Sequence, residues 1–194
     1  MAERKRAHRV CPWWLGYFLA TPARRLLQNP KKILKPWVSE GALVVEPGPG
    51  MGFFTLELAR LVGPGGRIVA VDIQPRMLEA LRRRARRAGL LDRIDARLAA
   101  PAGPGLGDIA GKADLVFAMA VVHEIPQAAE FFREMHGALK PGGKLLISEP
   151  RHHVSAEALG RTIGLAVAAG FKEEARPDIP RSLSVVLTRS PARD

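Results

Sequence analysis

The segment Val44–Gly52, which reads ValValGluProGlyProGlyMetGly, constrains the fold of this chain more than any other feature. An apolar run at 42–46 leads into it, and from Phe54 onward apolar residues recur at helical spacing. Its three alternating glycines permit tight turns and a close approach of the backbone to a ligand. The helix that follows presents free N–H groups and the positive end of its dipole at this turn. The pattern therefore predicts a strand, a ligand-binding turn and a helix, the unit from which parallel α/β sheets are built.

The rest of the chain alternates short apolar runs with amphipathic segments, as expected for the strands and helices of such a sheet. Glycine and proline mark the turns between them, for example at 63–66 and 141–143. The last two apolar runs are joined by a short connection, which predicts antiparallel pairing because a parallel crossover needs about a dozen residues or more. The predicted strands are 42–46, 67–72, 93–99, 113–122, 144–148, 171–176 and 183–188, and the predicted helices are 54–61, 75–88, 127–139 and 155–169.

The first forty residues do not fit this alternation. ThrPro at 21–22 and AsnPro at 29–30 each place a capping residue before a proline at the first helical position, which predicts two short helices. We expect residues 1–40 to form a helical cap and residues 41–194 to form the ligand-binding domain. The cap contains an aromatic-rich stretch that a short helix could lay over an active site. Its candidates for substrate contacts are Cys11, Trp14 and Tyr17.

Composition narrows the class of protein. The chain has 194 residues, of which 47% are apolar, as is typical of one globular domain. A net charge of +11 would favour nucleic acid or another polyanion, although biased base composition in the source genome would produce the same arginine excess. The single cysteine cannot form an intrachain disulfide, which favours the cytoplasm. No apolar stretch approaches the ~20 residues that span a bilayer, so we expect no membrane span.

Two positions define the ligand of the glycine-rich turn. In a nicotinamide or flavin dinucleotide site, a third glycine follows three residues after the second, and that position here is Phe53. Asp72 ends the second predicted strand, 22 positions after Gly50, where an acidic side chain can accept hydrogen bonds from both ribose hydroxyls. Capping of the next helix is the alternative role for Asp72. An adenosine-containing ligand without a pyrophosphate fits these residues best.

Four segments, in this order, resemble the motifs of class I S-adenosylmethionine-dependent methyltransferases. ValValGluProGlyProGlyMetGly resembles the first motif, and ValAspIle at 71–73 resembles the second. AspLeuValPheAlaMetAlaValValHisGluIle at 114–125 resembles the motif of the fourth strand, and LeuLysProGlyGlyLysLeuLeuIle at 139–147 resembles the turn before strand five. Each segment alone is common, but the ordered set is specific, and the resemblance extends from about residue 42 to the C-terminus.

The resemblance implies a Rossmann-like α/β fold with a seven-stranded, mostly parallel sheet whose last strand is antiparallel. It also implies S-adenosylmethionine as the cofactor and methyl transfer as the reaction. Glu46 would lie near the amino group of the cofactor, and Asp72 would hold its ribose. Further cofactor-binding residues carried over from the family are Gly48 and Gly50 beside the amino-acid tail, Met51 in the same turn, Ile73 and Met77 beside the adenine, and Ala118 and Met119 near the sulfonium.

One position departs from the family pattern. The family often has an acidic residue just after strand three that bonds the adenine amino group, whereas this chain reads Leu98, Ala99, Ala100 there. Either backbone groups make this contact or the third strand lies elsewhere.

His123 and Glu124 follow the fourth predicted strand, where the methyl acceptor should lie. Because the methyl donor is already activated, positioning supplies much of the acceleration and a base is needed only for some acceptors. His123 could accept a proton near neutral pH, or it could close the cofactor pocket or cap the next helix. His153 is a further candidate for a substrate contact. A soft-metal site built from histidines and Cys11 lacks a diagnostic spacing, so we predict no metal.

Absent motifs point to the type of acceptor. Base-amino methyltransferases of nucleic acids typically carry an Asp or Asn-ProPro-aromatic signature after strand four, where this chain has AlaMetAlaValValHisGlu. Cytosine-C5 enzymes use a Pro-Cys nucleophile in that region, which this chain also lacks. We therefore expect a small-molecule acceptor. An RNA methyltransferase and a non-catalytic module that binds S-adenosylmethionine or nucleic acid are the alternatives, and the arginines at 82–87 are either a phosphate-binding stripe or a solvent-facing helix side.

Overall fold

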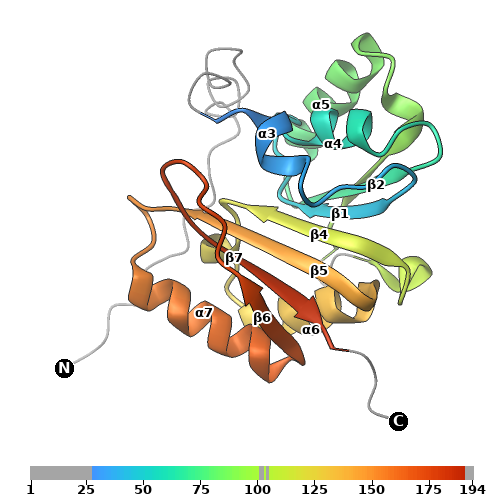
Figure 1. Ribbon diagram of the computed structural model, residues 1–194. Helices are drawn as coiled ribbons and strands as arrows, with labels where there is room; N and C mark the ends of the chain where they lie inside the picture. Colours follow the sequence, from blue (N-terminus) through green and yellow to red (C-terminus); the bar gives the residue numbers. More distant parts are fainter. Residues whose placement is uncertain (1–27, 101–102, 104, 191–194) are drawn as a thin grey trace.

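The computed structural model describes residues 28–100, 103 and 105–190, and it shows one twisted sheet with helices on both faces (Figure 1). The strand order is β3-β2-β1-β4-β5-β7-β6. Neighbouring strands from β3 to β5 pair in parallel, and β7 is antiparallel to both β5 and β6. The predicted seven-stranded, mostly parallel sheet with an antiparallel last strand is therefore confirmed. The strands are β1 (Leu43–Pro47), β2 (Arg67–Asp72), β3 (Ile94–Leu98), β4 (Ala113–Met119), β5 (Leu139–Pro150), β6 (Phe171–Ala175) and β7 (Ser182–Arg189).

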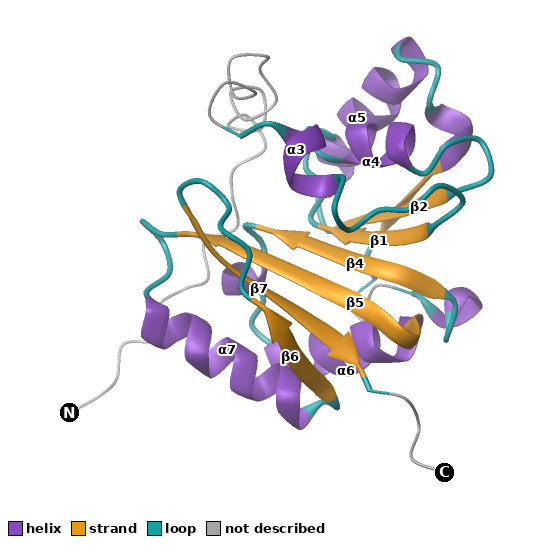
Figure 2. Cartoon of the chain, in the orientation of Figure 1, coloured by secondary structure: helices purple, strands orange, loops and turns teal. Residues whose placement is uncertain are grey.

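The helices bury the two faces of the sheet in separate apolar clusters (Figure 2). Successive residues of β1 alternate between them: Val44 packs with residues of α3, α4 and α5, and Val45 packs with residues of α6 and α7. Burial on both faces explains why the central strands read as continuous apolar runs. The helices are α3 (Pro30–Leu34), α4 (Thr55–Leu61), α5 (Pro75–Arg87), α6 (Ala128–Ala138) and α7 (Ala156–Ala168), with short 3-10 turns η1 (Leu91–Arg93), η2 (Gly107–Ile109) and η3 (Val122–Glu124).

The fourth strand ends earlier than predicted. We expected it to continue to Val122, but β4 ends at Met119, and Ala120 has a positive φ of 55°. Beyond this point the backbone leaves the sheet because its N–H groups find other acceptors. Ala120 N donates to the Ser148 carbonyl, and Val122 N donates to the Glu149 carboxylate. The apolar run at 120–122 therefore builds a loop at the carboxyl end of the sheet.

The fifth strand is longer than predicted. It begins at Leu139, five residues before the expected start at Lys144, because Leu139 pairs with Ala113 of β4. The pairing register shifts between Ala113 and Leu115, so the ProGlyGly sequence forms an irregularity within β5, near its start, rather than a free turn. The helix before it ends at Ala138, within one residue of the prediction.

The second predicted N-terminal helix is confirmed. Asn29 accepts a hydrogen bond from Lys32 N through its side chain, and Pro30 occupies the first position of α3. The helix expected after 21–22, together with Cys11, Trp14 and Tyr17, lies outside the described residues. Across the described part of the chain, the structure contains no helix that combines the length and apolar character needed to cross a membrane.

The strand order places the ligand edge. The chain starts at β1, builds β2 and β3 on one side, and then crosses back to build β4 and β5 on the other. Ligands of such sheets bind outside the carboxyl ends of the strands at this reversal, which lies between β1 and β4. The loops after β1, β2, β4 and β5 therefore form the candidate site.

Asp114 fixes the start of β1 against β4, and its replacement tests how much that contact stabilises the sheet. Asp114 Oδ2 accepts a hydrogen bond from Leu43 N at 2.7 Å, and the same carboxylate is paired with Lys140. We expect Asp114→Ala to lower the free energy of unfolding by about 1–3 kcal/mol, because a part-buried N–H loses its acceptor. Urea denaturation measures the change.

Asp114→Asn is the matched control, since its amide oxygen can still accept from Leu43 N. It should retain most of the lost stability. Equal losses in both variants would show instead that the ion pair with Lys140 carries the effect.

Candidate functional site

The glycine-rich turn adopts a conformation that L side chains rarely adopt. Gly48, Gly50 and Gly52 have φ angles of +66°, +54° and +82°. A Cβ atom on Gly48 would lie 2.6 Å from a methyl group of Val121, and one on Gly52 would lie 2.3 Å from a methyl group of Leu81. A Cβ on Gly50 would meet nothing within 4 Å. The turn is thus packed against protein at two glycines and open at the middle one.

Asp72 holds this turn from the end of β2. Its Oδ2 accepts a hydrogen bond from Gly50 N at 3.2 Å, and its Oδ1 accepts one from Gln74 N at 2.9 Å. Burial raises the pKa of Asp72, the bonds from Gln74 and Gly50 oppose that rise, and the charge of Glu124 adds to it. The bond from Gln74 N lies just before helix α5, whose start has no side-chain cap hydrogen bond. Each carboxylate oxygen keeps a second acceptor direction for a ligand.

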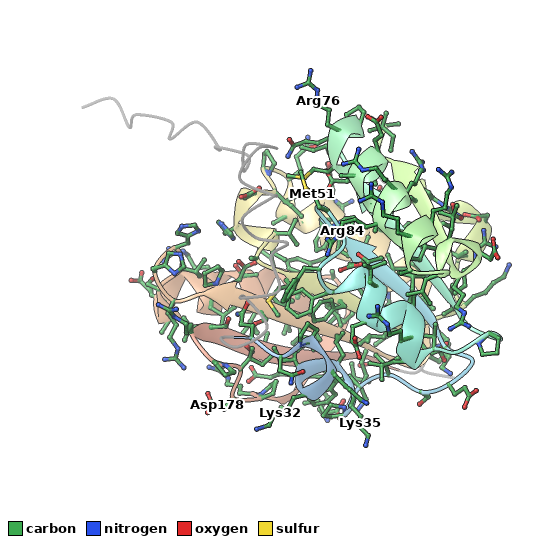
Figure 3. The ribbon with its side chains drawn as sticks, turned by 90° about the horizontal axis from the view of Figure 1, so that it is seen from above. Lys32, Lys35, Met51, Arg76, Arg84 and Asp178 are labelled. Carbon is green, nitrogen blue, oxygen red and sulfur yellow. The ribbon has the colours of Figure 1, made fainter. Side chains whose placement is uncertain are left out.

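The turn is also tied to α5. The Arg84 guanidinium donates to the Met51 carbonyl, and the two residues lie close together (Figure 3). The Met51 side chain packs with Met77 and Ala80 in a small buried cluster of its own. Met51 and Met77, both predicted to be cofactor-binding, are thereby brought together at one side of the turn.

Glu46 is buried near the carboxyl end of β1. The residue is 3% exposed, and its Oε2 has no hydrogen-bond partner among the described residues; Thr55 Oγ1 is likewise unpartnered. Burial raises the pKa of Glu46 to about 8, the nearby Thr55 hydroxyl opposes the rise, and the negative charge of Asp72 adds to it. Buried polar groups normally have partners, so an unpartnered carboxyl oxygen beside a ligand turn indicates a group that the ligand satisfies.

The ends of β4 and β5 form the other side of the site. Ala118 is fully buried and Met119 is partly exposed at the end of β4. Ala120 follows in the left-handed region, which is uncommon for a residue with a side chain and often marks a functional site. The chain then enters η3, which carries His123 and Glu124.

A buried glutamate orients His123. His123 Nδ1 lies 2.5 Å from Glu149 Oε2, and Glu149 Oε1 accepts a hydrogen bond from Val122 N at 2.8 Å. Glu149 is 2% exposed, on β5. The hydrogen bond with Glu149 raises the pKa of His123, burial opposes the rise, and the charges of Glu149 and Glu124 add to it. With Nδ1–H donating to the carboxylate, Nε2 is the nitrogen left to accept a proton.

Two further histidines lie beside His123. The rings of His123 and His153 are 5.4 Å apart, and those of His153 and His152 are 4.2 Å apart. Burial lowers the pKa of His153, and the charges of His152 and His123 add to that decrease. The described residues contain no group of three or more His, Cys, Asp or Glu side chains placed to hold a metal ion.

The third strand lies where it was predicted. β3 ends at Leu98, and Ala99 N donates to the Asp72 carbonyl, so the absence of an acidic residue after it does not come from a misplaced strand. Two large apolar side chains are exposed at this edge instead, Ile73 at 61% and Leu98 at 54%. They offer an apolar surface for a flat ring.

Sequence reasoning missed three features of the site: Glu149, Ala120 and the contact between Gly48 and Val121. A signal for Glu149 was present, since it is an acidic residue that ends the apolar run LeuLeuIleSer at 145–148. The other two depend on backbone angles and packing that the sequence pattern does not show. All predicted cofactor residues lie at the carboxyl ends of β1, β2 and β4 or in the first turns after them.

The fold and site define a class of protein: an α/β enzyme of doubly wound topology with an adenosine-type ligand at its reversal point. A family model described as a methyltransferase domain matches residues 45–147, more than half of the chain. The chain belongs to the S-adenosylmethionine-dependent methyltransferases, and S-adenosylmethionine is the cofactor of this class.

Relatives of known name share the same domain. The chain is 35% identical over 140 residues to ribosomal protein L11 methyltransferase of Pelotomaculum thermopropionicum, covering 72% of this chain and 41% of that protein. It is 28% identical over 179 residues to ubiquinone biosynthesis O-methyltransferase of Methylocella silvestris, covering 91% of this chain and 67% of that protein. A crystal structure of an S-adenosylmethionine-dependent methyltransferase from Aquifex aeolicus has the same fold, with a TM-score of 0.83 and 22% identity. The match covers 93% of this chain and 100% of that one. This chain thus spans between two fifths and two thirds of the two named relatives.

The residues present fit the cofactor. The unpartnered Oε2 of Glu46 suits an ammonium group, and the space beside Gly50 leaves room for an amino-acid tail. Asp72 has acceptor directions left for ribose hydroxyls, and the exposed Ile73 side chain suits one face of adenine. These four residues come from the two strand ends and turns that the sequence predicted.

Replacement of Asp72 tests the ribose contact. We expect Asp72→Ala to weaken binding of S-adenosylhomocysteine by at least about tenfold, because ribose loses an acceptor and Gly50 N and Gln74 N lose theirs. Isothermal titration calorimetry measures the affinity, and circular dichroism checks the fold. An affinity within a factor of two of the wild type would contradict the assignment.

Proposed function

We propose that the protein transfers the methyl group of S-adenosylmethionine to a small molecule whose acceptor atom carries a dissociable proton, such as a phenolic or enolic hydroxyl. The observation that carries this proposal is the pairing of His123 with the buried Glu149 beside the end of β4. The cofactor supplies an electrophilic methyl group on a sulfonium. The protein then has to hold the acceptor in line and remove its proton.

The His123–Glu149 pair is arranged for general base catalysis. A neutral hydroxyl is a weak nucleophile, and a positioned imidazole can take its proton as the new bond forms. Glu149 fixes the tautomer and orientation of the ring through Nδ1, and its carboxylate stabilises the imidazolium that proton transfer creates. Because Glu149 also accepts from Val122 N, its carboxylate is held in place on both oxygens.

The comparisons support a small-molecule acceptor. The match to the relative named for ubiquinone biosynthesis extends over 91% of this chain, whereas the match to the relative named for a ribosomal protein covers 72%. The longer match leaves less of the chain outside it. We place Trp14, Tyr17, Cys11 and His153 in that enclosure as predictions, and the cytoplasm as the compartment.

Nucleic acid is a weaker candidate partner. The net charge of +11 favours a polyanion, but two of the arginines at 82–87 in α5 donate hydrogen bonds to main-chain carbonyls of the chain itself. Arg82 donates to the Ala96 carbonyl and Arg84 to the Met51 carbonyl. Steeply salt-dependent binding of short RNA would support the RNA alternative, and its absence would support a small acceptor.

Replacement of His123 tests the base. We expect His123→Ala to lower kcat toward hydroxylated aromatic acceptors by about 10²–10⁴-fold with S-adenosylhomocysteine affinity changed little, because the base acts on the acceptor. His152→Ala is the control, since the His152 ring packs against His153, whose other ring neighbour is His123. Unchanged turnover in His123→Ala would show that His123 is not the base and only packs in the site.

The pH profile tests Glu149. His123 is active as a base only when neutral, and its pKa is raised by Glu149, so the rate should rise with pH through a value above 6.5. Glu149→Gln keeps an acceptor for Nδ1 but removes the charge, so we expect the acid limb of kcat to move to lower pH. A purely structural role would lower the rate at all pH values and leave the limb in place.

A further inference from the structure

Glu46 has the position expected of a residue that binds an ammonium group, but its burial disfavours the negative charge that such binding needs. It lies at the carboxyl end of β1, next to the turn that takes the amino-acid end of the cofactor, and it is almost completely buried. A carboxylate in that position would be a buried charge without a counter-charge, which is strongly unfavourable. The group therefore avoids the charge by holding a proton while the ammonium is absent.

The surroundings of Glu46 offer its anion a hydroxyl but, within the part of the chain that the structure describes, no cation that acts on it. The neighbouring strand β2 contributes Asp72, whose negative charge acts in the opposite sense. Helix α4 contributes Thr55, which is neutral. Strand β4, on the other side, carries Val116 and Phe117 beside this part of β1. Among the described residues that act on Glu46, none is cationic.

We propose that binding of the cofactor expels one proton from Glu46, so that S-adenosylmethionine and its product are bound in exchange for a proton released to solvent. The neutral carboxylic acid and the ammonium of the ligand become a carboxylate paired with that ammonium, and the proton passes to the buffer. The unpartnered Oε2, the open space beside Gly50 and the adjacent Asp72 are the geometry on which this rests.

The pH range of the effect follows from burial. Burial raises the pKa of Glu46 to about 8, so near pH 7 the free protein holds the proton, and the complex does not. Because one proton is released on binding, the affinity should rise about tenfold for each unit by which the pH increases toward 8. This holds as long as the amino group of the ligand stays protonated. S-adenosylmethionine and S-adenosylhomocysteine both carry the ammonium group. The proton exchange therefore affects their binding and release and not the methyl-transfer step.

Calorimetry measures the released proton directly. S-adenosylhomocysteine is titrated into the protein at pH 7 in phosphate and in Tris, whose ionisation enthalpies differ widely, and the difference in heat gives the protons released. We expect a value close to one, and an affinity that rises about tenfold from pH 6 to pH 7. The comparison ligand is 5′-methylthioadenosine, which has the adenine and ribose but no ammonium. It should bind with no proton release and with an affinity independent of pH.

Glu46→Gln is the matched variant, because the amide has the same shape and no proton to release. It should bind S-adenosylhomocysteine without proton release and with a flat pH profile. Equal release in the variant, equal release with 5′-methylthioadenosine, or no release in the wild type would each overturn the proposal. These results do not depend on the acceptor, so the proposed base and the proposed proton exchange fail separately.

The free protein gives a second readout. Folded Glu46 keeps its proton up to about pH 8, whereas the unfolded residue ionises near its ordinary pKa of 4.5, so the folded state binds more protons between these values. This contribution lowers stability as pH rises from 4.5 to 8. We expect the Tm of the wild type to fall relative to that of Glu46→Gln across this range. Parallel Tm profiles would contradict a raised pKa at Glu46.

Discussion

The two hydrogen bonds that Asp72 accepts, from Gly50 N and Gln74 N, hold the ligand edge of this protein together. They join the turn after β1 to the turn after β2, so one carboxylate ties together the two turns that carry most of the predicted cofactor residues. The same carboxylate is the group that we predict to bind the ribose, so one buried side chain would both shape the site and contact the cofactor. Its burial makes the arrangement sensitive, since removing it leaves two N–H groups unpaired.

A second contact couples this unit to the acceptor side. Gly48 leaves no room for a Cβ because Val121 packs against it, and Val121 directly precedes the 3-10 turn that carries His123. Any displacement of the glycine turn would therefore push on the loop of the proposed base. The positive φ of Ala120 belongs to the same arrangement, because it turns the chain out of β4 in time for Val122 N to reach Glu149. The two sides of the candidate site are thus linked through packed atoms.

The sequence predicted the sheet well because its signals are local and repeated. Apolar runs, glycine-marked turns and the AsnPro cap placed β2 at its observed bounds and most other elements within a few residues. It failed where long-range pairing decides the outcome: β5 was extended by the pairing of Leu139 with Ala113, and β4 was cut short because N–H groups at 120–122 found acceptors on β5. Glu149 was missed for a related reason, since its role depends on a partner 26 residues away. The cofactor residues remain predictions carried over from the resemblance, and the structure places them at the ends of β1, β2 and β4 or in the first turns after them.

The two buried glutamates of the site show how partners decide the state of similar groups. Glu149 has a main-chain N–H on one oxygen and an imidazole on the other, so its carboxylate is compensated and raises the pKa of His123. Glu46 has no partner on Oε2 among the described residues, and burial, with the charge of Asp72 adding to it, raises its pKa instead. The first arrangement is complete without a ligand and can serve every turnover unchanged. Under the proposed proton exchange, the second would become complete only when a cation arrives, and Glu46 would then select ligands that carry one.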